Sequence, residues 1–327
     1  MALDTQNTSD AETVATSDDL KAAPSRLARW WDSDLAYSFR RSPVAMLSGT
    51  MVFILVGAAL LAPLIAPTNP YDPASLNLMN GFTPPMTPNA FTGDEFFMGT
   101  DDQGRGVFST ILFGMRISLF VGFAAVAFAM ALGITLGLLA GYMGGRVDTV
   151  IMRVADVQLT FPAILVAILI FGIAKGITPV GARDEMAIWV LIIAIGLSDW
   201  VQFARVVRGA TLVEKSREYV AAAQLIGRSS GSIMLRHILP NVMSPVLVIA
   251  TISLALAIIA EATLSFLGVG APPTQPSLGT LIRIGQGFLF SGEWWILLFP
   301  SITLLLLALS VNLLGDWLRD ALNPKLR

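Results

Sequence analysis

The amino-acid sequence predicts an all-α membrane protein with six transmembrane helices. Of its 327 residues, 54% are apolar and only 13% are charged, whereas an ordinary soluble domain is about 25% charged. The mean hydropathy is +0.70. So few polar side chains cannot cover a globule of this size, and most of the surface is therefore expected to face lipid.

Six charge-poor runs are long enough to cross a bilayer, whose hydrocarbon core of about 30 Å needs about 20 helical residues. They cover residues 44–66, 117–145, 157–174, 186–207, 238–260 and 294–315. The fourth run is the weakest, because Asp199 interrupts it. An even number of spans places both termini on the same side of the membrane.

The basic residues are divided unequally between the two sides of these spans. Sixteen lie on the side of the termini, and five lie on the other side, namely Arg105, Arg116, Lys175, Arg183 and Arg283. Lysine and arginine are enriched in cytoplasmic loops. Both termini and the loop 208–243 are therefore expected in the cytoplasm, with residues 67–112 outside.

The N-terminal region divides into three segments. Residues 1–23 form an acidic tail that is expected to be disordered. Residues 24–41 interleave arginine with tryptophan and other apolar residues, which fits either an amphipathic segment at the membrane interface or a plain linker. The first transmembrane helix is expected within residues 42–66, and no cleavable signal peptide is predicted before it.

Two outer loops are rich in proline and glycine. The loop 67–112 is too long for a plain turn and is expected to be extended and turn-rich, as in a lid or gate. The loop 268–293 is expected to be similarly irregular. The remainder of the chain, residues 113–327, forms the core transmembrane domain.

Several kinds of chemistry are excluded by composition. The chain has no cysteine and one histidine, His237, so neither thiolate catalysis nor a multi-histidine metal site is available. No glycine is followed by lysine, so the phosphate-binding loop G-x-x-x-x-G-K-[ST] is absent. A net charge of −2 argues against nucleic-acid binding. We therefore expect neither an enzyme nor a cofactor-binding chain.

The most informative segment is the cytoplasmic elbow, residues 215–240. Its pattern predicts a helix from about residue 216 to 226, with Tyr219, Ala222, Ala223 and Ile226 along one face. Gly227 is expected to end this helix, since glycine turns without a Cβ penalty. A second short helix should carry Ile233, Met234, His237 and Ile238, and Pro240 should limit it. Such an elbow exposes small and apolar residues, which indicates a protein partner.

The elbow resembles the cytoplasmic signature of the inner-membrane permeases of ABC importers. That signature reads E-A-A, three residues, Gly, nine residues, I-x-L-P. The matching positions here are Ala221, Ala222, Ala223, Gly227, His237, Leu239 and Pro240. Ala221 stands in place of the glutamate and His237 in place of the isoleucine, with Glu218 a nearby carboxylate. The resemblance implies that the elbow docks on an ATPase subunit and couples ATP hydrolysis to transport.

Further motifs resemble the second, C-type permease of the oligopeptide and dipeptide permease family. They are Gly99-Thr100-Asp101 with Gly104-Arg105; Gly141 to Gly145 with Asp148, Arg153, Asp156 and Phe161-Pro162; Ala260 to Gly268; and Asn312 to Asp320. The resemblance implies a type I ABC importer permease fold in the bacterial inner membrane, carrying peptides. It also implies four partners: a second homologous permease, two ATPase subunits that hold ATP and Mg, and a periplasmic substrate-binding protein.

Three carboxylates lie in or at the edge of spans, where a charge is costly and needs a cavity or a partner. Asp156 is expected to pair locally with Arg153. Asp199 and Glu261 are candidates for the translocation path or its gating, although each also fits a structural role. Gly133, Gly137 and Gly141 recur every four residues, which favours close helix packing within the chain over packing on the second permease. Trp294 and Trp295 fit an aromatic belt at the outer interface.

Two other functions remain open. An ion-gradient-driven secondary transporter or channel would use Asp199 or Glu261 as its titrating group. A membrane-bound hydrolase would need a nucleophile and base that the sequence does not reveal. Within the importer class, nickel chelates, opines or glutathione are alternatives to peptides.

Overall fold

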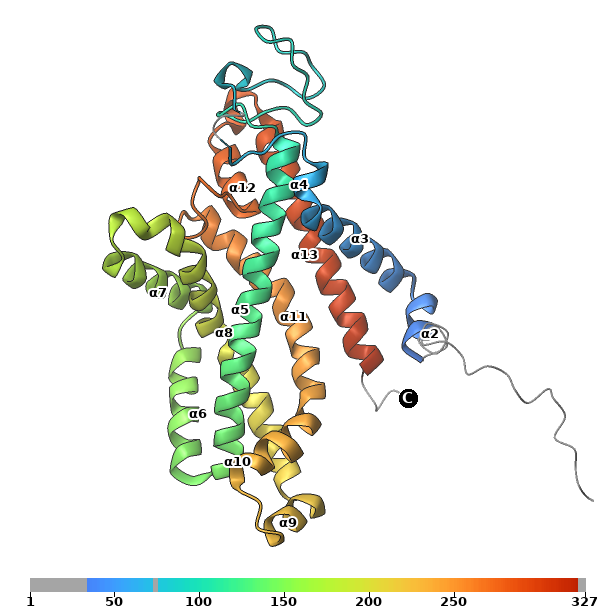
Figure 1. Ribbon diagram of the computed structural model, residues 1–327, viewed down its shortest axis with the longest axis vertical. Helices are drawn as coiled ribbons and strands as arrows, with labels where there is room; N and C mark the ends of the chain where they lie inside the picture. The colour runs from blue at the N-terminus through green and yellow to red at the C-terminus, as the bar shows by residue number, and fades with distance from the viewer. Residues whose placement is uncertain (1–33, 73–75, 323–327) are drawn as a thin grey trace, which may run out of the picture. The chain divides into compact units, whose positions relative to one another are not determined.

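The computed structural model describes residues 34–72 and 76–322 (Figure 1). The chain divides into two compact units, residues 1–42 and 43–327. In the first unit, helix α2 spans Asp34–Arg41 and carries Arg40 and Arg41 in its last turn. The acidic tail 1–23 and the first ten residues of the segment 24–41 lie outside the described residues.

The second unit is helical, and its elements follow one another along the chain. The α-helices are α3 Pro43–Leu60, α4 Ala62–Ile65, α5 Val107–Met143, α6 Gly145–Leu159, α7 Ala163–Ile177, α8 Arg183–Lys215, α9 Glu218–Leu225, α10 Ser230–Ile233, α11 Leu239–Phe266, α12 Leu278–Gln286 and α13 Trp294–Leu322. Short 3₁₀ turns are η2 Leu78–Asn80, η3 Val180–Ala182 and η5 Leu289–Ser291, and η4 Met234–Ile238 is a π-helical turn.

Within the described residues, five helical segments are long and apolar enough to cross a membrane, and the pair α6–α7 makes a sixth when it is counted as one span. This confirms the all-α architecture, with five or six candidate spans. Large apolar side chains are exposed on these helices, including Phe53 of α3 and Leu165 of α7. Such exposure suits helices whose solvent is lipid.

The third span differs from the predicted continuous helix 157–174. The helix is interrupted at Thr160–Pro162, and α6 and α7 are bent relative to each other by 97°. Pro162 has no N–H to donate and disfavours helical backbone at Phe161 before it. The loop 268–293 also differs from the irregular structure expected, because it contains the helix α12.

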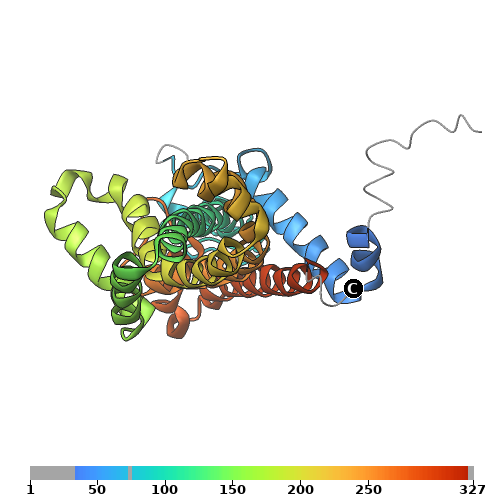
Figure 2. The ribbon, with the colours of Figure 1, turned by 90° about the horizontal axis from the view of Figure 1, so that it is seen from below.

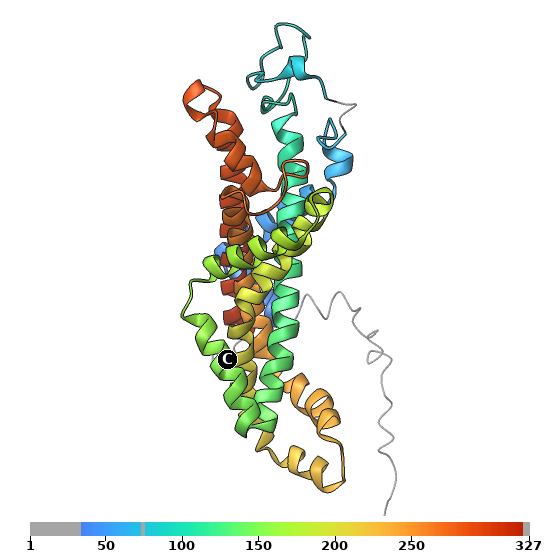
Figure 3. The ribbon, with the colours of Figure 1, turned by 90° about the vertical axis from the view of Figure 1, so that its left-hand side faces the viewer.

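The helices α5 and α8 run parallel and form the largest helix contact in the second unit (Figure 3). A Cβ added at Gly133 would lie 2.4 Å from Phe203 Cβ, one at Gly137 would lie 2.7 Å from Val207 Cβ, and one at Gly141 would lie 2.7 Å from Thr211 Cβ. The three glycines therefore meet the same face of α8 at a constant register. This confirms that they pack within the chain.

The other helices pack around this pair. The helix α11 contacts α5, α8, α12 and α13, while α3 packs on α13 and α5. The helix α7 packs on α8 and lies on the side of the bundle away from α13 (Figure 2). One large core cluster joins α5, α7, α8 and α11 and continues into the elbow, residues 215–240. A second cluster joins α3, α5, α11, α12 and α13.

Candidate functional sites

The elbow lies where α8 ends and α11 begins, at one end of the α5–α8–α11 bundle (Figure 1). It consists of α9, the turn at Gly227, α10 and η4. The predicted first helix is confirmed with slightly different bounds, since α9 spans Glu218–Leu225.

Gly227 ends α9 through two backbone hydrogen bonds. Its own N–H donates to Gln224 O at 3.0 Å, and the N–H of Arg228 donates to Ala223 O at 3.1 Å. This is the Schellman pattern, which requires a left-handed residue. Gly227 has a φ of +77°, so the predicted role of this glycine is confirmed.

The inner face of the elbow belongs to the main core. Val220, Ala223, Ile233 and Ile238 are all buried in the cluster that α5, α8 and α11 share. Because interiors of this kind are close-packed, the elbow and these helices form one continuous core. Ala222, next to Ala223, is exposed, as are the other two residues expected on the same face. The prediction of a shared face was therefore wrong for Ala223, which packs into the core.

The face of the elbow that points away from the helix core is apolar and exposed. Leu225 is 89% exposed, Ile226 79% and Leu235 62%. Glu218, Ala221 and Ala222 are exposed on the same short helix. Leucine and isoleucine side chains so far out of the core indicate a surface that another protein covers.

Polar contacts fix the elbow to the ends of α8 and α11. The Tyr219 hydroxyl donates to Glu214 Oε2 and accepts from Asn241 Nδ2 at 3.2 Å. Burial and the hydrogen bond to Glu214 raise the pKa of Tyr219, so the hydroxyl keeps its proton. The Asn241 amide also donates to the backbone oxygen of His237 at 2.7 Å.

The second part of the elbow runs into α11 without a break in the helical path. The turn η4 carries His237, and α11 follows with Leu239 and Pro240 in its first turn. Pro240 was expected to limit this helix. It does not, because the helical path continues through it into α11, with the π-helical turn η4 directly before it.

The elbow turn also fits the hydrolase pattern G-x-S-x-G, at residues 227–231. In hydrolases that pattern follows a strand and exposes a nucleophilic serine. Here α9 precedes the turn, and the Ser229 hydroxyl caps α10 by accepting from Ser232 N at 3.4 Å. Ser229 therefore has a capping role.

The structure separates Asp199 from Glu261. Asp199, half-buried on α8, borders a cavity of about 310 Å³ between α7, α8 and α11. Glu261 is fully buried outside that cavity lining, and its Oε1 accepts from the Ser265 hydroxyl at 2.7 Å. Of the two candidates for the path, Asp199 is the one that borders open space.

Asp156 pairs with a partner other than the one predicted. Its Oδ1 lies 2.6 Å from Arg205 Nη2 on α8, and Arg153 is not its partner. Eight residues earlier on α6, Asp148 Oδ2 lies 2.6 Å from Arg208 Nη2. Two ion pairs therefore connect α6 to α8.

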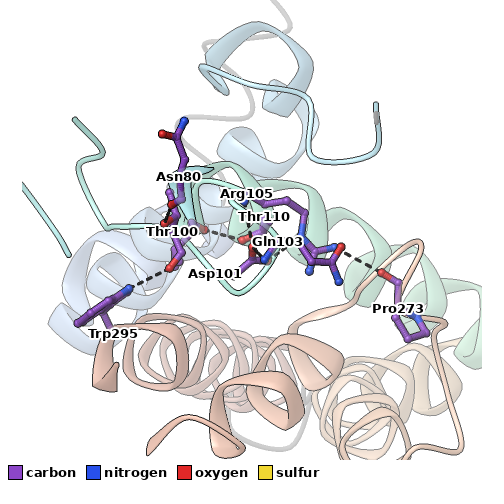
Figure 4. A network of polar contacts seen from close by, with 9 residues as sticks. Asn80, Thr100, Asp101, Gln103, Arg105, Thr110, Pro273 and Trp295 are labelled. Atoms are coloured by element: carbon purple, nitrogen blue, oxygen red, sulfur yellow. Dashed lines mark hydrogen bonds and ion pairs between the residues drawn. The ribbon is translucent and has the colours of Figure 1, made fainter. Parts of the chain in front are cut away.

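The outer loop between α4 and α5 is folded around a buried polar network (Figure 4). The Thr100 hydroxyl donates to Asn80 O at 2.5 Å and accepts from Thr83 N at 2.8 Å. Asp101 Oδ2 accepts from Arg105 Nε at 2.6 Å. The expected turns are present in the described residues of this loop, but the loop is shorter than predicted, because α5 already begins at Val107.

Two contacts at the two ends of this network hold the loop on α13 and on the segment between α11 and α12 (Figure 4). Trp295 Nε1, on α13, donates to Thr100 O at 3.0 Å. Arg105 Nη1 donates to the backbone oxygen of Pro273 at 3.5 Å. The motif of Thr100, Asp101 and Arg105 was recognised in the sequence, but their partners on α13 and before α12 were not. Trp295 was expected in an aromatic belt, and in the structure it binds the loop.

Residues 133–327 match the family described as the binding-protein-dependent transport system inner membrane component. Residues 30–85 match the N-terminal transmembrane domain of oligopeptide transport permease C. These two regions together cover most of the chain.

Curated relatives align along most of their length. The dipeptide transport system permease protein DppC of Haemophilus influenzae is 36% identical over 89% of this chain and 94% of its own. The oligopeptide transport system permease protein OppC of Bacillus subtilis is 35% identical over 94% and 93%. The glutathione transport system permease protein GsiD of Pectobacterium atrosepticum is 37% identical over 88% and 89%.

Among solved structures, a chain of the MetNI methionine ABC transporter aligns with a TM-score of 0.49 and 17% identity, over 65% of this chain and 96% of its own. Members of the matched family are membrane components of transport systems; they are not enzymes and bind no cofactor, because ATP is hydrolysed on separate subunits. The chain belongs to the binding-protein-dependent inner-membrane permeases of ABC importers, as an oligopeptide/dipeptide permease of the C type.

Proposed function

We propose that this permease forms, with a second homologous permease, the translocation path of an ATP-driven importer for di- or oligopeptides. Relatives at 35–36% identity are permeases of dipeptide and oligopeptide systems. A glutathione permease is equally similar, and glutathione is itself a peptide. A periplasmic binding protein would deliver the substrate, and two ATPase subunits would drive transport.

The elbow is the proposed contact with an ATPase subunit. The observation that carries this assignment is that the elbow has one buried face and one exposed face. Val220 and Ile238 are in the core, while Leu225 and Ile226 are largely exposed. The exposed face supplies an apolar docking surface, and the buried face transmits movement to α5, α8 and α11. Closure of the ATPase pair would then switch the helices between two states by differential binding.

Glu218, Ala221, Ala222, Gly227, His237, Leu239 and Pro240 belong to this proposed contact or shape it, and Ala223 supports it from the core side. Asp199 is the proposed path-lining residue, because it borders the cavity between α7, α8 and α11. Glu261 is assigned a structural role, since Ser265 donates to it and no part of it is exposed.

Co-purification tests the coupling assignment. A tagged chain extracted in detergent should retain the second permease and both ATPase subunits. Leu225→Asp places a charge in the docking surface and should release the ATPase subunits, because a buried unpaired charge is costly. The matched control is Leu78→Asp, which alters a leucine of the outer loop that is 75% exposed.

Retention of the ATPase subunits by Leu225→Asp at wild-type amounts would contradict the assignment. A chain that transports substrate in the absence of any ATPase subunit would favour the ion-gradient-driven alternative, with Asp199 as its titrating group. The ligand retained by the cognate binding protein distinguishes a peptide from a nickel chelate or an opine.

Both termini and the elbow are proposed to be cytoplasmic, with the outer loop in the periplasm. The unequal division of basic residues supports this orientation. The natural chain has no cysteine, so single cysteines report their own position. Ala90→Cys should react with a membrane-impermeant maleimide in spheroplasts, and Ser230→Cys only after lysis. The reverse pattern would contradict the orientation.

A further inference from the structure

A cavity of about 290 Å³ opens on the side of the permease that carries the outer loop. Its walls are the end of α7, the start of α8, the chain that follows α11 and the helix α12. Apolar lining from Phe171 and Val190 is combined with a small set of charged groups.

The charged groups are predominantly basic. Lys175, Arg183 and Arg283 line the cavity together with one carboxylate, Asp184. These cations are three of the five basic residues outside the cytoplasmic set. The other two are Arg105, which is paired with Asp101, and Arg116, which does not line the cavity. The scarce positive charge of the outer face is thus concentrated at one cavity.

These three cations have spare hydrogen-bonding capacity. Among the described residues, no carboxylate lies within 4.0 Å of the charged nitrogens of Lys175, Arg183 or Arg283. Arg183 Nε donates to the backbone oxygen of Thr178 at 3.3 Å, which holds the side chain in place and leaves its other guanidinium nitrogens available. An anion could therefore be bound without first breaking an ion pair.

The wall that carries Arg283 is built by the chain turn after α11. Gly268 has a φ of +80°, and Val269 N donates to Leu264 O at 2.8 Å, which is the same helix ending as at Gly227. A Cβ at Gly268 would lie 2.8 Å from Arg283 Nη1, so the missing side chain makes room for the guanidinium. Arg105 fixes the neighbouring Pro273 to the outer loop.

We propose that this cavity binds the C-terminal carboxylate of the peptide as it enters the permease. This inference rests on the proposed function and specifies the chemistry of one end of the substrate. Arginine presents a planar donor fork that matches a carboxylate, and the cavity volume suits a chain terminus better than a whole oligopeptide. Every unmodified linear peptide ends in this group, so the site accepts many side chains.

The test compares a dipeptide that has a free carboxylate with the same dipeptide as its C-terminal amide. The complete transporter is reconstituted in liposomes with its binding protein, and ATP-dependent uptake is measured for wild type, Arg283→Gln and the control Arg116→Gln. The ratio of variant to wild-type rate is taken for each peptide separately, so that the preference of the binding protein cancels.

Arg283→Gln should lower uptake of the free dipeptide about tenfold, the loss expected for about one charged hydrogen bond, and should leave uptake of the amide little changed. Arg116→Gln should leave both ratios near one. Lys175→Gln, from α7, should repeat the selective loss and provides a second variant if Arg283→Gln fails to accumulate. An equal loss for both peptides, or no loss for either, would overturn the proposal.

An anionic lipid headgroup offers similar chemistry, so uptake is measured in neutral phosphatidylcholine liposomes and in liposomes that also contain phosphatidylglycerol. The proposal predicts the same selective loss in both. A loss confined to phosphatidylglycerol liposomes would assign the cavity to lipid and overturn it. Absence of ATP-dependent peptide uptake by the wild type would instead overturn the proposed function, and this inference with it.

Discussion

Trp295 is the residue that connects the outer loop to the transmembrane helices most directly. Its side chain is 7% exposed, and its indole N–H donates to Thr100 O. The backbone of Gly99 makes this contact possible, since a Cβ there would lie 2.8 Å from Trp295 Nε1. The adjacent Trp294 is 46% exposed and has no such contact with the loop.

Trp295→Phe should therefore loosen the outer loop. It keeps most of the ring but leaves the buried oxygen of Thr100 without its donor, which costs about 1–3 kcal/mol. Thermal unfolding in detergent should show a lower midpoint, and a protease added to spheroplasts should cut the loop faster. Trp294→Phe is the matched control and should behave like wild type. Equal behaviour of the two variants would contradict the role given to Trp295.

For single residues, the sequence was informative where the structural role depends only on residues nearby in the chain. Gly227 was identifiable because a left-handed helix ending needs glycine and the ending depends on neighbouring residues only. The partner of Asp156 was not identifiable, because Arg205 is 49 residues away and reaches α6 only through the packing of α8. Arg105 and Trp295 were missed as a loop anchor for the same reason.

The pair α5–α8 is the element on which the membrane core is built. Three glycines at intervals of four residues bring the backbone of α5 against α8. A Cβ added at Gly137 would lie 2.6 Å from Ala204 O. Close approach of this kind increases the dispersion contacts that hold membrane helices together where no hydrophobic force acts between them.

Gly137→Leu should disrupt this pair. Overpacking a close contact costs about 1–3 kcal/mol, and here a backbone atom stands in the way. The amount of chain recovered from membranes should fall, together with its thermal stability in detergent. The control is Gly172→Leu on α7, where a Cβ meets nothing within 4 Å. Normal recovery of Gly137→Leu would contradict the packing described for α5 and α8.

Charge-poor runs located the five long spans and the α7 half of the bent pair α6–α7, because a charge inside a bilayer is costly whatever the surrounding fold. They did not reveal the break between α6 and α7, since a run of apolar residues says nothing about backbone geometry at Pro162. They also did not reveal α12, which is too short to span a membrane. The pattern of side-chain polarity therefore predicted where the spans lie, but not the bend within one of them or the short helix between two others.

For the second unit as a whole, the main core connects the membrane helices to the elbow. Residues of α5, α7, α8 and α11 share one cluster with Val220 and Ile233. An ATPase subunit that moves the elbow would therefore move the helices that border the Asp199 cavity. We propose that this connection carries the work of ATP hydrolysis into transport.

The most direct measurement is ATP-dependent peptide uptake by Gly227→Leu in the reconstituted transporter. A side chain at a φ of +77° is strained, at a cost of about 1–2 kcal/mol, so the elbow should lose its shape while the membrane helices remain intact. Gly93→Leu imposes the same strain at a φ of +74° in open space on the outer loop and serves as the control. Both variants should be present in the membrane at wild-type amounts, with uptake abolished for Gly227→Leu and retained for Gly93→Leu. Uptake by Gly227→Leu at the wild-type rate would contradict coupling through the elbow.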